Sequence, residues 1–162
     1  MGGAAVGGSA KQWSTRVVKV RTLRPAERAW ANGCYAEVSF KPSGPQDFVA
    51  VAELEAQRVG LGRLVRVADA VAELGGIYVM PGYRGRQVAR AVVSFLLARS
   101  PYPTLYCIPF AHLDAFYRSF GFAPPPDASH LPAAVADKVS WCATQYVEPV
   151  SVLVRRKADG DG

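Results

Sequence analysis

The sequence predicts one α/β domain built on a mixed (α+β) sheet, and three observations support that fold class. The chain has 162 residues, half of them apolar and a fifth charged, which suits a single domain with a proper core. A meander of three strands stands in the middle of the chain, and amphipathic helices alternate with single strands around it. We expect residues 15–157 to form this domain, between a flexible leader at 1–14 and a flexible tail at 158–162.

The first half of the predicted domain contains a strand, a helix and the meander. Charged and apolar residues alternate loosely over residues 16–23, as in a strand, and Pro25 then opens a short helix that reaches about Tyr35. A loop rich in proline and glycine covers 41–47. Three strands follow closely enough to pair antiparallel, at 48–55, 58–67 and 71–80.

The second half of the predicted domain alternates helices with strands. Apolar residues recur at helical spacing before Pro101 and Pro103 end that helix, and the apolar strand after them suits a buried position beside strand 71–80. A later short helix ends at Gly121, in the manner of a helix C-cap. The expected order is helix (84–99), strand (104–108), helix (111–119), a strand-like piece, helix (about 131–142) and strand (149–155).

Composition argues against several classes of protein. No apolar stretch approaches the roughly 18 residues needed to span a bilayer, so we expect no membrane segment. Cys34, Cys107 and Cys142 stand at no metal-ligand spacing, which predicts no metal site and favours a reducing cytosol. The net charge of +6 is spread along the chain without a nucleic-acid motif, and an anionic cofactor explains its sign equally well. We therefore expect a cytoplasmic protein that binds neither membranes nor nucleic acid.

Residues 73–89 are the most informative stretch, a strand that runs through a tight turn into an amphipathic helix. The N-terminus of a helix offers unpaired backbone N–H groups and the positive end of the helix dipole. Arg84 and Arg86 add positive charge there, while Gly82 and Gly85 let the backbone come close to a ligand. These features predict a pyrophosphate site. A plain strand-to-helix turn with exposed arginines is the alternative.

Two motifs in the chain resemble those of the GNAT superfamily of acyl-CoA N-acyltransferases. They are Val79-Met-Pro-Gly-Tyr-Arg-Gly-Arg-Gln-Val-Ala and Phe116-Tyr-Arg-Ser-Phe-Gly-Phe. Arg84, Arg86 and Ala89 match the family pattern of the first motif, and the order of elements agrees from about residue 17 to 155. The resemblance implies a GNAT-like fold, in which an antiparallel meander and splayed parallel strands carry flanking helices, and it implies acetyl-CoA as cosubstrate.

The resemblance also implies which residues contact acetyl-CoA. In the family, the strand before the turn splays from its neighbour and admits the pantetheine arm, and a strand N–H such as that of Val79 can stabilise the oxyanion of a tetrahedral intermediate. Ordinary strand residues are the alternative. Gln87 stands where the family usually has glycine, and it adds a side chain near the phosphates. The expected cofactor contacts are Ile77, Tyr78, Val79, Arg84, Gly85, Arg86, Gln87, Val88, Ala89 and Phe116.

Tyr117 and Glu73 are the expected catalytic residues. Tyr117 lies where the family commonly has a tyrosine near the thioester sulfur, and a phenol can give a proton to the departing CoA thiolate. A core aromatic residue is the alternative role for Tyr117. Glu73 lies where several family members carry a catalytic glutamate that deprotonates the amine, and a solvated charge is the alternative. Glu53 and His112 are weaker candidates for the base.

Acceptor contacts are expected from the segment between the first strand and the meander. Trp30, Tyr35, Glu37 and Phe40 can line a small amphipathic pocket, with Glu37 pairing an ammonium, although a helix packed on a sheet uses the same residue types. We therefore expect acetyl transfer to the primary amine of a small molecule, amino-acid-like or other. The alternatives are a protein lysine or N-terminal amine, and a non-catalytic acyl-CoA-binding module suggested by Gln87. Many members of the family form dimers, so the resemblance also allows a homodimer here.

Overall fold

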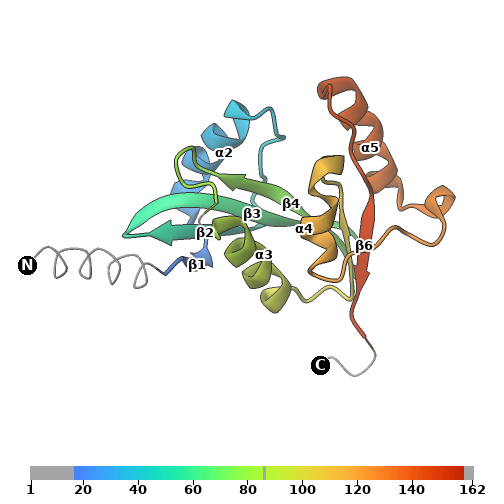
Figure 1. Ribbon diagram of the computed structural model, residues 1–162, viewed down its shortest axis with the longest axis horizontal. Helices are drawn as coiled ribbons and strands as arrows, with labels where there is room; N and C mark the ends of the chain where they lie inside the picture. Colours follow the sequence, from blue (N-terminus) through green and yellow to red (C-terminus); the bar gives the residue numbers. More distant parts are fainter. Residues whose placement is uncertain (1–16, 86, 159–162) are drawn as a thin grey trace, which may run out of the picture.

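A computed structural model describes residues 17–85 and 87–158, and in it six strands form one sheet in sequential order (Figure 1). All neighbouring strands are antiparallel apart from β4 and β5, so the expected mixed sheet is confirmed. The strands are β1 (Lys19–Thr22), β2 (Phe48–Leu54), β3 (Gln57–Ala68), β4 (Val71–Val79), β5 (Thr104–Cys107) and β6 (Leu153–Arg156). The helices are α2 (Arg28–Glu37), α3 (Val88–Arg99), α4 (Asp114–Arg118) and α5 (Ala133–Gln145), with 3-10 turns at Pro25–Glu27, Ala111–Leu113 and Ala128–His130.

The described part of the chain contains no helix that is long and apolar enough to cross a membrane. The expected leader at 1–14 and nearly all of the expected tail lie outside the described residues, as does Arg86.

The meander of β2, β3 and β4 is confirmed, and each strand begins and ends within one residue of its expected position. Its first turn is tight, because Glu55 and Ala56 alone join β2 to β3, with φ of 53° and 65°. Two successive residues with positive φ give a turn whose twist matches the right-handed twist of the flanking strands. The turn therefore fixes the register of β2 against β3.

Strands β4 and β5 run parallel for a short distance and then separate. Pairing ends with Glu73 opposite Tyr106, after which β5 stops at Cys107 while β4 continues to Val79. On its other side, β5 pairs antiparallel with β6. The edge of β4 beyond Glu73 is thus open toward β5, and this is the splay that the family resemblance implied.

A β-bulge changes which face of the sheet β4 presents. The register with β3 shifts by one residue here, so that Gly76, with φ of 59°, and Ile77 both lie opposite Gly62. As a result Leu74 before the bulge and Ile77 after it pack on the same core cluster. Tyr78 packs on the opposite face, in the cluster that contains residues of α2.

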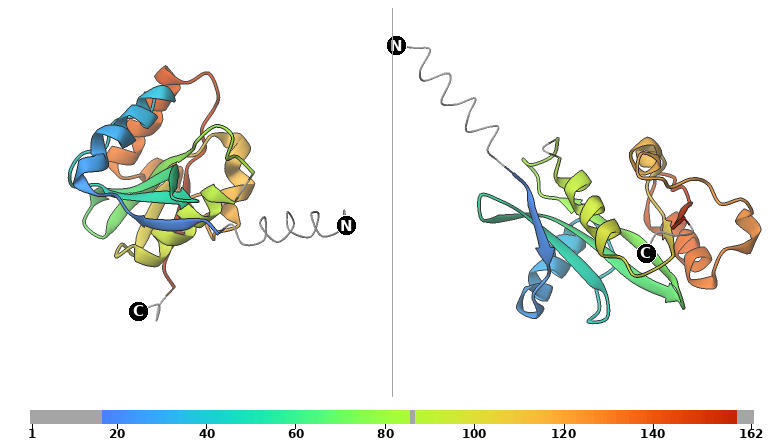
Figure 2. Two further views of the ribbon diagram at one scale, coloured as in Figure 1. Left: turned by 90° about the vertical axis from the view of Figure 1, so that its left-hand side faces the viewer. Right: turned by 90° about the horizontal axis from the view of Figure 1, so that it is seen from below.

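Helices cover both faces of the sheet, with α3 and α4 on one face and α2 and α5 on the other (Figure 2). Helix α3 packs closely on β3, because Gly60 and Gly62 have no side chains. A Cβ at Gly60 would lie 2.5 Å from Cγ1 of Val88, and one at Gly62 would lie 2.4 Å from Cγ1 of Val92. This close approach fixes the N-terminus of α3 beside the end of β4.

Three expected elements differ from the structure. The helix expected from residue 84 begins at Val88, because the left-handed conformation of Gln87 extends the preceding turn. The strand-like piece is only an isolated bridge between Ala123 and Val154. The last strand begins at Leu153 and not at 149, because the residues before it run beside the segment that follows β5 and lie outside the sheet.

Candidate active site

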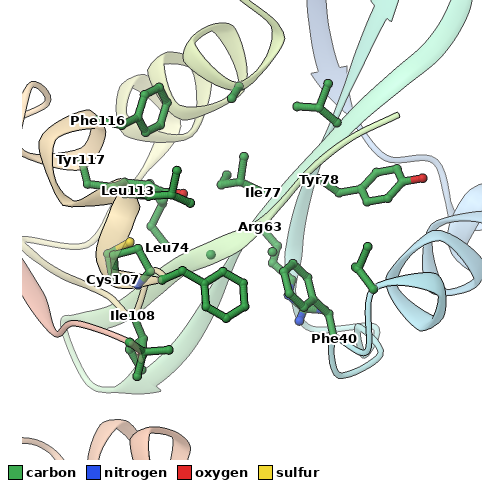
Figure 3. Close-up of a pocket in the computed structure, with 18 of the residues that line it drawn as sticks. Phe40, Arg63, Leu74, Ile77, Tyr78, Cys107, Ile108, Leu113, Phe116 and Tyr117 are labelled. Atoms are coloured by element: carbon green, nitrogen blue, oxygen red, sulfur yellow. The ribbon is translucent and has the colours of Figure 1, made fainter. Parts of the chain in front are cut away.

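A cavity of about 840 Å³ follows the open edge of β4 (Figure 3). Its middle is lined by β4 from Glu73 to Val79. One end lies at the turn before α3, where Tyr83, Arg84 and Gly85 line it, and the other end lies between α5 and the loop after α2. A single cavity therefore runs from the expected pyrophosphate turn to its second end. This second end, between α5 and the loop after α2, is called the chamber below.

The turn before α3 presents backbone N–H groups to the first end of the cavity. Gly85 and Gln87 both have positive φ, at 79° and 63°. The N–H of Ala91 donates to the Gln87 carbonyl at 3.1 Å, and the N–H groups before it in the first helical turn have no intrahelical acceptor. Together with Arg84 and the helix dipole, these donors have the geometry of a phosphate site.

Gln87 is the N-cap of α3 and holds a left-handed backbone, with φ of 63° and ψ of 16°. A residue with a Cβ in this conformation costs about 1–2 kcal/mol. Glycine adopts the conformation without that cost, which explains physically why the GNAT pattern favours glycine here. The Gln87 side chain is exposed, so it leaves the backbone amides of the turn accessible.

Backbone N–H groups of β4 face the cavity where β5 is absent. The N–H of Met80 donates to the Val59 carbonyl of β3 at 2.8 Å. Because successive N–H groups of a strand point to opposite neighbours, the N–H of Val79 points away from β3, to the open edge. The side chain of Tyr78 extends toward α2, where its hydroxyl donates to Glu37 at 3.2 Å, and burial raises the pKa of Tyr78 to about 12 (Figure 3).

Tyr117 lies on α4, and its hydroxyl is directed into the cavity (Figure 3). The residue is 5% exposed, and its hydroxyl makes no hydrogen bond to the part of the chain that the structure describes. Burial raises the pKa of Tyr117 well above its ordinary value, and the Cys107 thiol adds a smaller shift in the same direction. Phe116 packs edge-on against the Tyr117 ring, with centroids 5.0 Å apart, and also lines the cavity. Tyr117 therefore stays protonated at neutral pH, with its O–H available to a ligand.

Glu73 lies where β4 and β5 separate, and its partner is Lys138 of α5. Glu73 is only 7% exposed, and Nζ of Lys138 donates to its Oε2. Both residues line the cavity. Glu73 is therefore a buried, ion-paired carboxylate and not a solvated charge. Sequence reasoning missed Lys138, because the pattern of its helix marks the apolar face and nothing distinguishes this lysine from an exposed one.

Aromatic side chains wall the second end of the cavity. Tyr146, just after α5, meets Phe40, Phe110 and Trp141 edge-on, with centroid distances of 6.4, 5.1 and 5.7 Å. Its hydroxyl donates to the Ser39 carbonyl at 2.8 Å, which ties the end of α5 to the loop after α2. The wall is thus continuous between two segments that are far apart in the sequence.

Basic side chains outnumber acidic ones at this second end. Lys41, Arg63 and Lys138 line it from three different segments, whereas Glu73 and Glu148 are the acidic lining residues. The local charge is therefore positive at the end where an ammonium group was expected to find a negative partner.

The expected acceptor contacts Trp30, Tyr35 and Glu37 of α2 do not line the cavity. The Trp30 ring lies 4.0 Å from the guanidinium of Arg58. Tyr35 is fully buried, and its hydroxyl donates to the Gly76 carbonyl at 2.8 Å. Glu37 accepts the hydrogen bond described above. The loop after α2 lines the cavity in their place, through Val38, Phe40 and Lys41.

Of the two weaker candidates for the base, only His112 lies at the cavity. His112 lines the cavity and stacks on Phe110, with centroids 6.2 Å apart. Glu53 instead accepts a hydrogen bond from Nε of Arg21 at 2.5 Å, and does not line the cavity. Within residues 17–85 and 87–158, no group of His, Cys, Asp and Glu side chains could hold a metal ion.

Several solved structures share this fold at low sequence identity. N-acetylglutamate synthase from Neisseria gonorrhoeae, complexed with coenzyme A and N-acetyl-glutamate, has a TM-score of 0.65 and 13% identity over 86% of this chain and 35% of its own. Rv2747 from Mycobacterium tuberculosis, in complex with CoA, has a TM-score of 0.65 and 17% identity over 86% of this chain and 99% of its own. The ribosomal-protein-S18-alanine N-acetyltransferase from Escherichia coli has a TM-score of 0.63 and 16% identity over 90% of this chain and 99% of its own. The chain thus spans about a third of the synthase and nearly all of the other two proteins.

Residues 45–124 match the family model of the acetyltransferase (GNAT) domain. The matched segment runs from just before β2 to just after α4, and so contains the open edge of β4, the turn before α3 and Tyr117. No curated protein matches the sequence. This match assigns residues 45–124 to the acetyltransferase (GNAT) domain family, in agreement with the GNAT resemblance of the two sequence motifs.

Proposed function

We propose that the protein transfers the acetyl group of acetyl-CoA to the primary amine of a small molecule. The observation that carries the proposal is the continuous cavity along β4, which joins the turn before α3 to the aromatic chamber beside α5. The first end suits a pyrophosphate, the open strand edge suits an extended pantetheine arm, and the chamber suits a small acceptor. A cavity of about 840 Å³ has the size of a typical ligand site.

In the proposed binding mode, the cofactor lies along the β4 edge. Arg84 and the first N–H groups of α3, from Val88 and Ala89, hold the pyrophosphate. The β4 backbone from Ile77 to Val79 pairs with the pantetheine arm. The N–H of Val79, which points to the open edge, then donates to the oxyanion formed when the amine attacks the thioester carbonyl.

The proposed chemistry moves two protons away from the acceptor nitrogen. Glu73 accepts the first, directly or through a water, so that the neutral amine can attack the thioester carbon. The nitrogen gives up the second as the carbon–sulfur bond breaks, and the departing thiolate gains a proton. Tyr117 donates a hydrogen bond to the developing charge on sulfur and relays that proton. Lys138 positions the Glu73 carboxylate.

The second end of the cavity favours a small acceptor over a protein one. A protein amine would enter most easily along an open, acidic groove, whereas this chamber is walled by Phe40, Phe110, Trp141 and Tyr146 and lined by more basic than acidic groups. The hydrogen bond from Tyr146 to Ser39 supports the wall. The similar solved structures do not decide between the two acceptors, because fold is shared across different substrates.

The test combines binding with turnover. Acetyl-CoA affinity would be measured by calorimetry, and release of the CoA thiol would then be followed with small amines, amino acids and peptides. We expect cofactor binding and thiol release that depends on a small amine. Release with peptides alone would support a protein acceptor, binding without release would support a non-catalytic module, and absence of binding would overturn the cofactor site.

A further inference from the structure

Arg63 of β3 is a buried cation that lines the second end of the cavity without an acidic partner. It is 4% exposed. Its Nη1 donates to Oγ of Ser43 at 2.6 Å, and its guanidinium lies 4.3 Å from the centroid of the Tyr35 ring. Among the described residues, no carboxylate forms an ion pair with Arg63. Figure 3 shows the residue among those that line the cavity.

This arrangement leaves a positive charge uncompensated. Burying a guanidinium removes it from water, and the cost is recovered only when a negative group and further hydrogen bonds replace that water. The two acidic residues that the described chain buries as whole residues already have cationic partners, since Glu27 pairs with Arg21 and Glu73 with Lys138. The Tyr35 ring offsets part of the cost for Arg63. The missing counter-charge can therefore come from a ligand in the cavity.

We infer that Arg63 binds a carboxylate of the acceptor, so that the acetylated amine belongs to an amino carboxylic acid; the inference rests on the proposed acetyl transfer. Nη1 of Arg63 is occupied by Ser43, whereas Nε and Nη2 donate to no described residue. These two donors form the edge of a guanidinium that receives a planar carboxylate through two parallel hydrogen bonds. Arg63 thereby determines which amines are accepted.

The register of β3 against β4 places Arg63 and Glu73 on the same face of the sheet, before the bulge. Arg63 pairs with Gly75, two residues along β4 from Glu73. A Cβ at Gly75 would lie 3.1 Å from Oε2 of Glu73, and one at Gly76 would lie 2.8 Å from Nε of Arg63. The proposed base and the guanidinium thus flank two consecutive glycines. An acceptor whose amine and carboxylate are a few bonds apart can reach both, while Lys138 remains paired with Glu73.

The experiment compares amino acids with their matching carboxamides, which keep the amine and side chain but lose the negative charge. Wild-type protein loaded with acetyl-CoA should show a higher kcat/KM for the acid of at least one pair, by about tenfold or more, because the amide leaves the guanidinium unpaired. In Arg63→Gln the acid-to-amide ratio should fall by about tenfold. The readout is the change in this ratio between wild type and variant. The ratio in one protein alone is not sufficient, because the pKa of the amine differs between the acid and its amide.

Two further variants separate carboxylate binding from a structural role. Ser43→Ala removes the partner of Nη1 but keeps the charge, and it should retain the preference for the acid. Arg63→Lys keeps the charge without the two-pronged edge, so its ratio should lie between those of wild type and Arg63→Gln, and it carries the test if Arg63→Gln does not fold.

The outcomes distinguish this inference from the proposed function. If acids and amides are acetylated with the same ratio in wild type and in the Arg63 variants, the carboxylate site is wrong while acetyl transfer stands. Preference for an aminophosphonate over the matching amino acid would also overturn the carboxylate assignment. If acetyl-CoA binds and no amine of either kind is acetylated, the proposed function fails and the inference fails with it.

Discussion

The carboxylate of Glu73 and the ammonium of Lys138 form an ion pair that joins β4 to α5 at the point where β4 and β5 separate. If Glu73 is the base, Glu73→Gln should lower kcat at about pH 7 by roughly 10² or more. The rate of this variant should then rise steeply with pH, because the amine loses its proton to water instead. Thiol release measured across a pH series checks this, and a variant rate equal to wild type would exclude Glu73.

Tyr117→Phe should reduce turnover while leaving acetyl-CoA affinity nearly unchanged. Phenylalanine keeps the edge-on packing against Phe116 and Phe122, at 5.0 and 6.2 Å, and removes only the hydroxyl. We expect a loss of about 10–100-fold in kcat, the scale of a positioned proton donor. Calorimetry and single-turnover thiol release separate the two effects. Unchanged turnover would remove Tyr117 from the mechanism.

The pH profile of the wild-type protein gives a second test of Tyr117. Burial raises the pKa of this phenol well above its ordinary value near 10. A raised pKa means that the protonated form persists as the pH increases, so activity should show no decline from tyrosine ionisation up to about pH 10. A wild-type decline below that pH that disappears in Tyr117→Phe would show that Tyr117 ionises earlier than its burial implies.

Arg84→Ala should weaken acetyl-CoA binding by about tenfold, because a charge-assisted hydrogen bond to phosphate is lost. Affinity measured by calorimetry at two salt concentrations should also show a smaller salt dependence in the variant. Arg118→Ala is the matched control, since Arg118 is an exposed arginine of α4 that does not line the cavity. Equal affinities for Arg84→Ala and Arg118→Ala would mean that the phosphates bind elsewhere.

Gln87→Gly should stabilise the fold. The native φ of 63° costs a residue with a Cβ about 1–2 kcal/mol, and glycine recovers most of it after its own loss of chain entropy. We expect a rise in Tm of about 2–4 °C for a net gain near 1 kcal/mol. Gln87→Ala shortens the side chain but keeps the Cβ, and it should give no such rise. An equal rise in both variants would assign the effect to the glutamine side chain instead.

Acid should weaken the fold through Glu27, which accepts hydrogen bonds from Arg21 at 2.7 and 2.9 Å and from Arg58 at 3.3 Å. The hydrogen bonds from Arg21 are the main cause that lowers the pKa of Glu27 from 4.5 to about 2. A lowered pKa stabilises the fold above the ordinary value of 4.5, and this contribution is lost as the pH falls toward 2.

Glu27→Gln tests this contribution. The variant should lose about 2 kcal/mol of unfolding free energy at neutral pH, since hydrogen bonds to charged groups contribute about 1.5–3 kcal/mol. Its stability should also vary less with pH below the ordinary pKa of a glutamate. Urea denaturation at a series of pH values measures both effects, and parallel curves for wild type and variant would contradict the role of Glu27.

Periodicity predicted most of the fold, because the sheet and its helices bury regular patterns. Each strand of the meander is a run rich in apolar residues, and only short turns join the three runs, so the strand ends could be placed within one residue. The start of α3 could not be placed in the same way. Its boundary depends on the left-handed backbone of Gln87, and a glutamine in the sequence does not predict that conformation.

The turn before α3 is also easier to recognise in the sequence than the second end of the cavity. Arg84 and Gly85 lie in one local turn, so the sequence shows them together. The pair of Glu73 and Lys138 joins positions 65 residues apart, and Arg63 meets Tyr35 only after the sheet has formed. A lone lysine or arginine is ordinarily exposed, and only burial in the folded chain distinguishes these two residues.

The bulge at Gly76 shifts the alternation of side chains along β4 by one residue. Before it, Glu73 faces α5 and Leu74 faces α3; after it, Ile77 faces α3 and Tyr78 faces α2. Without the extra residue the alternation would continue unbroken, and every side chain beyond that point would change sides. Substitutions along β4 therefore alter one face of the sheet at a time, whereas deletion of one residue at the bulge would exchange Ile77 and Tyr78 between the two faces. The number of residues in β4 therefore decides which helices Ile77 and Tyr78 meet.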